Sequence, residues 1–215
     1  MRKILIIANG AWEESADGLL RSLAAQADYR IAADGGWRLA RRAGLRVEQV
    51  IGDGDSLSLE ERTELLKLGI WQRHPADKDQ TDLELALAEA LAQHADKITC
   101  AALLGKRADQ ALGNLFTLEG PARAGAQIEV VTPEERLYLV RDELQLTQAR
   151  LGDIVSLLAL TDRVSGLETQ GLRWPLRGEG LSRTATRGIS NQVISLPVVI
   201  QLFEGLLWVI HRSEI

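Results

Sequence analysis

Several features that direct a chain to a particular compartment or partner are missing from this sequence. Its 215 residues include a single cysteine, Cys100, so no disulfide can form within the chain, and a reducing compartment fits best. The apolar run at residues 4–8 is too short for a signal-peptide core or a membrane span, and no other stretch approaches about 18 apolar residues. We therefore expect a cytoplasmic protein without a membrane partner.

Basic charge and histidine are also scarce. The net charge of −5 gives no reason to expect a nucleic-acid partner. The three histidines, at positions 74, 94 and 211, are scattered, and their spacing is not that of a metal site or a catalytic base. Anionic substrates are not excluded, because a bound metal can reverse the sign of one cleft.

The first 132 residues alternate between short apolar runs and segments with helical periodicity. The clearest helical segment is 81–93, which opens with the capping-box sequence Thr81-Asp82-Leu83-Glu84, and Ser58 opens another helix in the same way. The expected strands are residues 3–8, 29–33, 49–52, 70–74, 98–104 and 128–132. Strands that alternate with helices predict a mostly parallel sheet with helices on both faces.

The pattern changes at residue 133. Short strand-like runs follow one another closely, and no helix-length periodic segment interrupts them. The expected strands are residues 137–141, 154–160, 164–169, 171–176, 193–196, 198–203 and 206–211, with a hairpin turn at Glu204-Gly205. We therefore predict two domains: α/β over residues 1–132, and a small antiparallel β-sandwich or barrel over residues 133–215.

Aspartates follow four of the predicted strands of the first domain. They are Asp34, the pair Asp53 and Asp55, the group Asp77, Asp79 and Asp82, and Asp109. Because the carboxyl ends of parallel strands share one edge of a sheet, these carboxylates should converge there, where ligands bind. Such a cluster would repel itself without a cation. Oxygen ligands with no His or Cys among them favour Mg²⁺ over zinc.

Each segment by itself also has a simpler interpretation. Asp-Gly pairs are ordinary turn residues, and Asp82 at a helix start can complement the helix dipole. An EF-hand is excluded, because its glycine and its glutamate at the twelfth position are absent. Lys106 and Arg107 beside Asp109 are more specific, since two cations next to a carboxylate at a helix start suit a phosphate that shares a metal. The four segments together favour a phosphate- and metal-binding site.

The order and spacing of these motifs resemble the thiamine pyrophosphokinase family across nearly the whole chain. The matching motifs are Asn9-Gly10, Ala33-Asp34-Gly35-Gly36, Gly52-Asp53-x-Asp55-Ser56, Asp77-x-Asp79-x-Thr81-Asp82, Arg107-x-Asp109-Gln110-x-x-x-Asn114, Gly152-Asp153-x-x-Ser156-Leu157, Gly171-Leu172-Arg173-Trp174-Pro175-Leu176 and Gly188-Ile189-Ser190-Asn191. Three positions depart from the family pattern. Gly54 replaces a more frequent Phe, Gln110 a more frequent His, and Val193 lies near where some members place an aromatic that stacks on thiamine.

The resemblance implies a Rossmann-like ATP-binding catalytic domain followed by a β-sandwich for thiamine binding and dimerisation, in a homodimer with shared active sites. It implies transfer of the diphosphate of ATP to the hydroxyl of thiamine. Mg²⁺ and the phosphates would be held by Asp53, Asp55, Asp82 and Asp109, and either Asp82 or Asp55 would orient the hydroxyl. The residues expected to hold ATP are Asn9, Asp34, Gly35, Gly36, Lys78, Thr81, Arg107 and Gln110.

In the second domain, Ser190 and Asn191 suit the aminopyrimidine edge of thiamine, although the same pair also suits an Asx turn before a strand. Trp208 is expected to pack in the core, and Trp174 either packs in the core, the interpretation we favour, or contacts the ligand. Two other functions fit part of the pattern. A Mg²⁺-dependent nucleotide phosphohydrolase would use the same carboxylates but needs no Ser190-Asn191 element. A non-catalytic thiamine- or nucleotide-binding protein has little use for four metal ligands.

Overall fold

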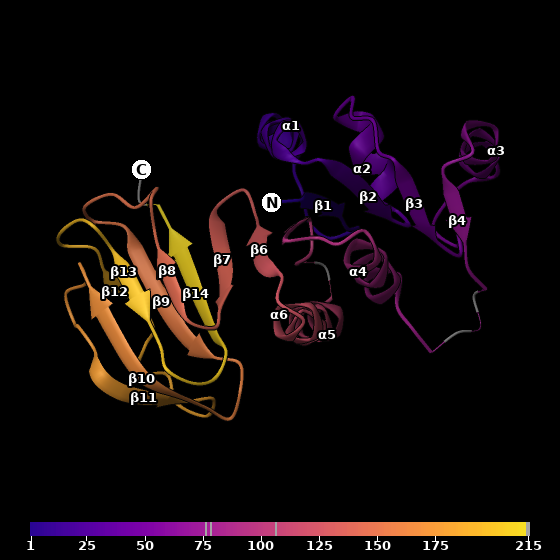
Figure 1. Cartoon of the computed structure of the whole chain (residues 1–215). Coiled ribbons are helices and arrows are strands. Elements are labelled where there is room, and N and C mark those ends of the chain that lie inside the picture. The colour runs from indigo at the N-terminus through magenta and orange to yellow at the C-terminus, as the bar shows by residue number, and fades with distance from the viewer. Residues whose placement is uncertain (76, 78, 106, 214–215) are drawn as a thin grey trace. The chain divides into compact units, whose positions relative to one another are not determined.

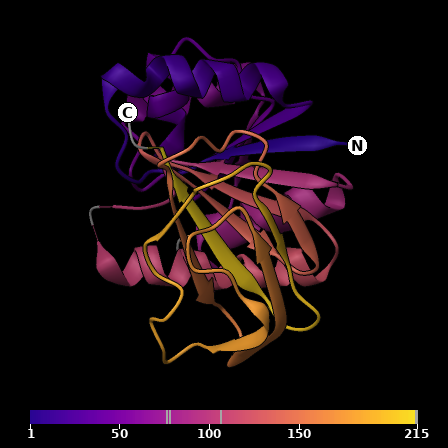
Figure 2. The same cartoon turned by 90° about the vertical axis from the view of Figure 1, so that its left-hand side faces the viewer.

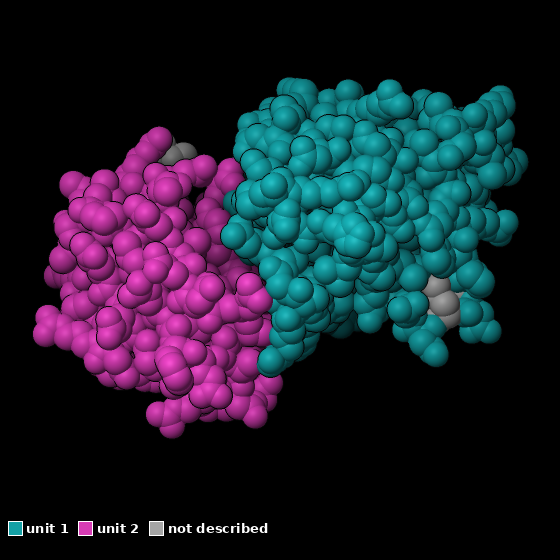
Figure 3. Space-filling model, in the orientation of Figure 1, with its two compact units in different colours: residues 1–133 teal, residues 134–215 magenta. Residues whose placement is uncertain are grey.

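The computed structural model describes residues 1–75, 77, 79–105 and 107–213 (Figure 1). The chain divides into two compact units, Met1–Pro133 (unit 1) and Glu134–Ile215 (unit 2), which Figure 3 shows in different colours. Within the described residues, no helix combines the length and the apolar character needed to cross a membrane.

Unit 1 contains a parallel β-sheet. Its strands are β1 (Lys3–Ile7), β2 (Tyr29–Ala33), β3 (Gln49–Gly52), β4 (Trp71–Arg73), β5 (Lys97–Ala101) and β6 (Gln127–Val131), and they lie in the order β6-β5-β1-β2-β3-β4. Every neighbouring pair is parallel. The chain moves outward from β1 to β4 and then returns to the other side of β1 for β5. Sheets of this kind bind ligands at the carboxyl ends of their strands, beside such a reversal.

Helices cover both faces of this sheet (Figures 1 and 2). They are η1 (Glu14–Ala16, a 3₁₀ turn), α1 (Asp17–Gln26), α2 (Gly36–Arg42), α3 (Leu59–Leu68), α4 (Asp82–Ala92), α5 (Ala108–Thr117) and α6 (Glu119–Arg123). Leu5 and Ile7 pack with α1 and α2, whereas Ile4 and Ile6 face the other way and are equally buried. The strands are therefore apolar on both faces, as expected for a covered parallel sheet.

Both capping boxes expected in unit 1 are confirmed. The Ser58 hydroxyl accepts the backbone N–H of Glu61 at the start of α3, and the Thr81 hydroxyl accepts that of Glu84 at the start of α4. In each case the glutamate side chain accepts the backbone N–H of the capping residue in return. These local bonds fix where the two helices begin.

Unit 2 consists of two antiparallel sheets. The strands are β7 (Glu135–Val140), β8 (Glu143–Gln145), β9 (Ile154–Ala159), β10 (Arg163–Gln170), β11 (Arg177–Ser182), β12 (Asn191–Gln192), β13 (Val199–Gln201) and β14 (Leu207–Arg212). One sheet has the order β12-β9-β14-β7, and the other has the order β11-β10-β13-β8. Leu157 and Val209 from the first sheet share one core with Leu167 and Ile200 from the second. The expected sequence of an α/β region followed by an all-β region is confirmed.

Three details expected in unit 2 are wrong. Residues 171–176 and 193–196 form no strand of their own, because Leu172, Leu176 and Val193 are buried from loops and so imitate a strand pattern. Glu204-Gly205 does not close a hairpin, since β13 and β14 belong to different sheets. The short strand β8 has too few apolar residues to be recognised in the sequence.

Candidate active site

Three of the aspartates that follow strands of unit 1 come together. Asp34 directly follows β2, Asp53 directly follows β3, and Asp82 is the first residue of α4, after β4. One carboxylate oxygen from each lies within 4.8 Å of the other two, and we call this group the carboxylate cluster. Asp34 is buried, and Asp53 and Asp82 are half-buried. The donor set contains only carboxylate oxygens, which fits a hard divalent cation such as Mg²⁺.

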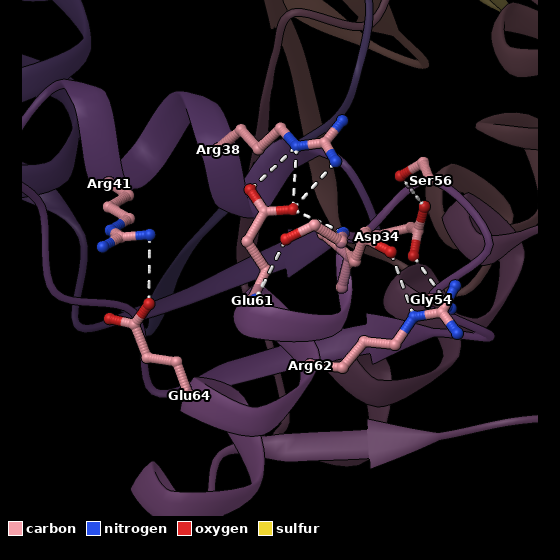
Figure 4. A network of polar contacts seen from close by, with 10 residues as sticks. Asp34, Arg38, Arg41, Gly54, Ser56, Glu61, Arg62 and Glu64 are labelled. Carbon is pink, nitrogen blue, oxygen red and sulfur yellow. Dashed lines mark hydrogen bonds and ion pairs between the residues drawn. The ribbon is translucent and has the colours of Figure 1, made fainter.

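Asp34 joins β2 to the loop that carries Asp53. Its carboxylate accepts the backbone N–H of Gly54 at 3.1 Å and the hydroxyl of Ser56 (Figure 4). Its own backbone N–H donates to the carbonyl of Ile51 at 2.8 Å. The resemblance implied that Asp34 holds the nucleotide. The structure places its carboxylate in the carboxylate cluster, which its position directly after a strand also predicted.

The loop after β3 is held from a second side by Trp71 of β4. The indole N–H of Trp71 donates to the carbonyl of Gly52 at 3.3 Å. Gly54 has φ +77°, and a Cβ there would lie 2.6 Å from the Trp71 ring. Any side chain at position 54 would therefore meet the Trp71 ring and would also have to adopt a left-handed backbone, which favours glycine here.

Asp55 and Asp109 lie outside the cluster that the described residues form. Asp55 is exposed, and its backbone N–H donates to the carboxylate of Asp53 at 2.8 Å. Asp109, in the first turn of α5, accepts hydrogen bonds from the guanidinium of Arg107, at 3.1 Å from Nε. These bonds lower the pKa of Asp109 to about 2. Both side chains of this pair are exposed.

The residues expected around the nucleotide divide into two groups. Asn9, Gly35 and Gly36 are closely packed: a Cβ at position 35 would lie 2.3 Å from the Asn9 side chain, and one at position 36 would lie 2.0 Å from the Ile7 carbonyl. At position 36 the conflict is with backbone, so only glycine fits there, whereas at position 35 the exposed Asn9 side chain would have to move. Thr81 and Gln110 are exposed in the first turns of different helices, and Lys78 lies outside the described residues.

Unit 2 contains a pocket of about 610 Å³ that includes both residues expected to bind substrate. We call it the Trp174 pocket. Its lining residues are Leu157, Arg173, Trp174, Pro175, Leu176, Arg187, Gly188, Ile189, Ser190 and Asn191. The Trp174 side chain is 58% exposed, so the expectation that it packs in the core is wrong, whereas Trp208 is buried in β14 as expected. The Arg173 guanidinium lies 5.2 Å from the centre of the Trp174 ring.

Asn191 forms the buried wall of this pocket. Its side-chain oxygen accepts the backbone N–H groups of Trp174 at 3.1 Å and Gln192 at 2.9 Å, and its side-chain nitrogen donates to the Trp174 carbonyl at 2.7 Å. Asn191 therefore fixes the backbone of Trp174, a function that its sequence position did not reveal. Ser190 is exposed at φ +60°, and its backbone N–H donates to the Ser156 hydroxyl at 3.0 Å.

A parallel sheet with carboxylates gathered at its strand ends is typical of α/β proteins that bind phosphate-containing ligands at this edge of the sheet. The family comparisons are more specific. Residues 20–130 match the model described as the thiamin pyrophosphokinase catalytic domain, and residues 141–207 match the thiamin pyrophosphokinase vitamin B1 binding domain. The chain belongs to the thiamin pyrophosphokinase family.

Relatives of full length support this assignment. A thiamine pyrophosphokinase of Bacillus subtilis is 27% identical over 100% of both chains. The crystal structure of thiamine pyrophosphokinase from Bacillus subtilis matches with a TM-score of 0.85 at 25% identity, over 100% of both chains. That of thiamin pyrophosphokinase from Geobacillus thermodenitrificans matches with a TM-score of 0.82 at 28% identity, over 99% of this chain and 98% of the other.

Proposed function

We propose that this chain is a thiamine diphosphokinase, which transfers the diphosphate of ATP to the hydroxyl of thiamine and releases AMP. The observation that carries the proposal is the presence of two complementary sites in one chain. The segment that matches the catalytic model contains an oxygen-only carboxylate cluster, and the segment that matches the vitamin B1 model contains the Trp174 pocket. On this proposal unit 1 is a Rossmann-like ATP-binding domain and unit 2 is a β-sandwich that binds thiamine.

The carboxylates of Asp53 and Asp82 would hold Mg²⁺, and Asp34 would share this task while it fixes the loop after β3. Bound Mg²⁺ would neutralise phosphate charge as the β-phosphorus is attacked. Asp55 and Asp109 remain in the proposed catalytic set, since both flank the same edge of the sheet. Asp82 or Asp55 would accept the hydrogen bond of the attacking hydroxyl and so orient its oxygen.

The phosphate oxygens and the nucleotide would be held by side chains and backbone of unit 1. Arg107 and Lys78 would bind phosphate oxygens, because cations form strong charge-assisted hydrogen bonds with them. Asn9, Gly35 and Gly36 would let the nucleotide approach the backbone closely, with Asp34, Thr81 and Gln110 at the border of the site. The hydroxyl oxygen of thiamine would form a bond to the β-phosphorus while its proton passes to the carboxylate that orients it, Asp82 or Asp55. The bond from the β-phosphorus to the oxygen it shares with the α-phosphate would break, and AMP would leave with that electron pair.

Thiamine would bind in the Trp174 pocket. The Arg173 guanidinium lies over one face of the largely exposed Trp174 ring, and the other face would attract a cation such as the thiazolium ring. The Ser190 hydroxyl and the remaining N–H of Asn191 would meet the aminopyrimidine. The side-chain oxygen of Asn191 already accepts two backbone N–H groups, one for each lone pair. Asn191 would therefore act toward thiamine only as a hydrogen-bond donor.

Product analysis tests the reaction directly. The protein is incubated with ATP, Mg²⁺ and thiamine, and the nucleotides and thiamine species are separated. We expect AMP and thiamine diphosphate in equal amounts. ADP with phosphate would instead identify a phosphohydrolase, and thiamine binding without turnover would identify a binding protein.

We propose further that the chain works in the cytoplasm as a homodimer with shared active sites. If each site uses unit 1 of one chain and unit 2 of the other, Asp82→Asn chains should complement chains in which both Ser190 and Asn191 are replaced by alanine. Each parent should be inactive, whereas a mixed dimer would contain one intact site and show activity. No activity after confirmed subunit exchange would place Asp82 and the Ser190-Asn191 pair in the site of one chain.

A further inference from the structure

A buried acid–base pair lies in unit 2 beside the Trp174 pocket but lines no part of it. The Nε2–H of His211, in β14, donates to a carboxylate oxygen of Asp153 at 2.7 Å, and the two side chains are 4% and 0% exposed. The same oxygen of Asp153 accepts the backbone N–H of Arg150 at 2.8 Å. Asp153 belongs to the Gly152-Asp153-x-x-Ser156 motif, to which the proposed reaction assigns no role.

Residues 150–153 form a turn, which we call the Asp153 turn, and this turn is hydrogen-bonded to the residue that follows β12. The backbone N–H of Gly152 donates to the carbonyl of Val193 at 2.9 Å, and the N–H of Val193 donates to the carbonyl of Asp153 at 2.9 Å. His211 and Asn191 both lie opposite Val155 in their respective strand pairs, so the three form one row across the sheet. The pair therefore bonds the turn directly and lies in the same row of the sheet as the first residue of β12.

The segment that begins with β12 in turn holds the loop that presents Trp174. Asn191 bonds both the N–H and the carbonyl of Trp174, and the Gln192 carbonyl accepts the N–H of Arg173 at 2.9 Å. Ser156 of the same motif accepts the N–H of Ser190. Hydrogen bonds from His211 to Asp153 and from the Asp153 turn to Val193, together with the backbone of residues 191–193, thus connect the pair to the wall of the pocket.

Stability alone is a weak reason to bury such a pair. Burying polar and charged groups costs desolvation energy, and well-packed apolar residues of similar volume often stabilise a fold equally well. What apolar residues do not supply is a directional bond that sets the Asp153 turn at one position. The best-attested use of buried polar pairs is to fix a register in this way.

We propose that Asp153 and His211 are positioning residues for thiamine, which set the Trp174 pocket through β12; the ligand rests on the function proposed above. His211→Phe keeps an aromatic ring, although a larger one, and removes the hydrogen bond, whereas His211→Gln places an amide N–H near the original Nε2 position. Leu207→Ala serves as a matched control. Leu207 lies on the same strand and is fully buried, but it pairs with Val140 and Ala159, away from the Asp153 turn.

Hydrogen exchange of backbone amides reports the positioning without any ligand. His211→Phe should speed exchange at Trp174 and Val193 by about tenfold, more than at amides in the middle of β9, because local opening follows the loss of local bonds. His211→Gln should remain near the wild type. Unchanged exchange at Trp174 in His211→Phe, or equal acceleration in Leu207→Ala, would overturn the proposal.

Calorimetric titration with thiamine and, separately, with ATP reports the consequence for binding. His211→Phe should raise the Kd for thiamine about tenfold, since small misplacements of binding groups have effects of this size or larger, and leave the Kd for ATP unchanged. Equal losses for both ligands would contradict a role in the pocket. If the wild type binds no thiamine while exchange still responds to His211, the proposed function fails and the positioning stands.

If His211→Phe does not fold, a second variant can test the same proposal. The double substitution Asp153→Asn with His211→Phe removes the buried charge together with its partner, so no unpaired charge is left in the core. It should show the same accelerated exchange at Trp174. Wild-type exchange in this variant would overturn the proposal.

Discussion

In unit 1 the candidate site gathers charged groups at the ends of parallel strands, whereas in unit 2 it is a pocket walled by loops and by one exposed indole. The carboxylate cluster uses side chains that point at one another from successive strand ends. The Trp174 pocket depends on backbone bonds made by residues behind its wall, Asn191 and Ser156. Changes in unit 1 should therefore act on the chemistry, and changes in unit 2 on the affinity for one ligand.

The largest difference should appear between two aspartates of unit 1. Asp82→Asn removes a charge from the carboxylate cluster, and we expect turnover to fall about a thousandfold. Asp109→Asn, outside the cluster, should lower turnover only about tenfold. Without Mg²⁺ the melting temperature of Asp82→Asn should stay equal or rise, because one source of repulsion is gone. Steady-state kinetics measures the turnover of the two variants, and thermal melting measures the stability of Asp82→Asn. Equal losses of turnover would place Asp109 with the cluster.

The next effect concerns the exposed indole of unit 2. Trp174→Ala should raise the Kd for thiamine about tenfold, because a cation over an aromatic face contributes up to about 2 kcal/mol. Trp174→Phe should retain most of the affinity, and the Kd for ATP should change in neither variant. Calorimetric titration of each ligand provides the comparison. A loss of ATP affinity in Trp174→Ala would contradict the expectation that the Trp174 pocket binds thiamine and not ATP.

Arg107 gives a smaller effect on the opposite ligand. Arg107→Ala should weaken ATP binding severalfold and leave thiamine binding unchanged, since Arg107 is expected to bind phosphate oxygens. The melting temperature should stay the same, because both partners of the Arg107–Asp109 pair are exposed and such pairs contribute little to stability. Titration with each ligand and thermal melting test this; equal losses for both ligands would contradict the assignment.

The smallest effect is one of stability and is limited to unit 1. Hydrogen bonds from Arg38, with a further backbone bond from Ser58, lower the pKa of Glu61 to about 2 (Figure 4). Its ionised form therefore stabilises the fold above the ordinary glutamate pKa, and this stability is lost as the pH falls from about 4.5 toward 2.

Glu61→Gln should accordingly lower the free energy of unfolding by about 1 kcal/mol at neutral pH, a value reduced for the exposure of Arg38. The difference from the wild type should shrink toward zero in acid. Urea unfolding at several pH values measures it, with the exposed Glu60→Gln as the control in the same helix turn. A difference that does not depend on pH would assign the effect to packing.

The sequence predicted unit 1 better than unit 2 for a physical reason. Capping boxes at Ser58 and Thr81 are local signals, and all parallel strands of one sheet end at the same edge, so Asp34, Asp53 and Asp82 could be placed together before their distances were known. Asp109 lies outside this cluster of the described residues, and its carboxylate is bonded instead to the neighbouring Arg107.

In unit 2 the strand partners are set by contacts between distant residues. The buried loop residues Leu172 and Val193 imitate a strand, and β13 and β14 separate into different sheets although only a short turn connects them. The side chain of Asn191 turned out to bond the backbone of Trp174, which no local pattern indicates. The sequence could therefore name two residues of the pocket, Ser190 and Asn191, but the way the pocket is built could not be derived from it.

The burial of Cys100 has a practical consequence. This residue, the single cysteine of the chain, is fully enclosed in β5, where burial raises the pKa of its thiol to about 12. Alkylating reagents act on the thiolate, so the folded protein should resist them. A cysteine introduced at a surface position such as Glu60 or Phe203 would then be the one site that a dye or spin label modifies, and natural Cys100 need not be replaced first.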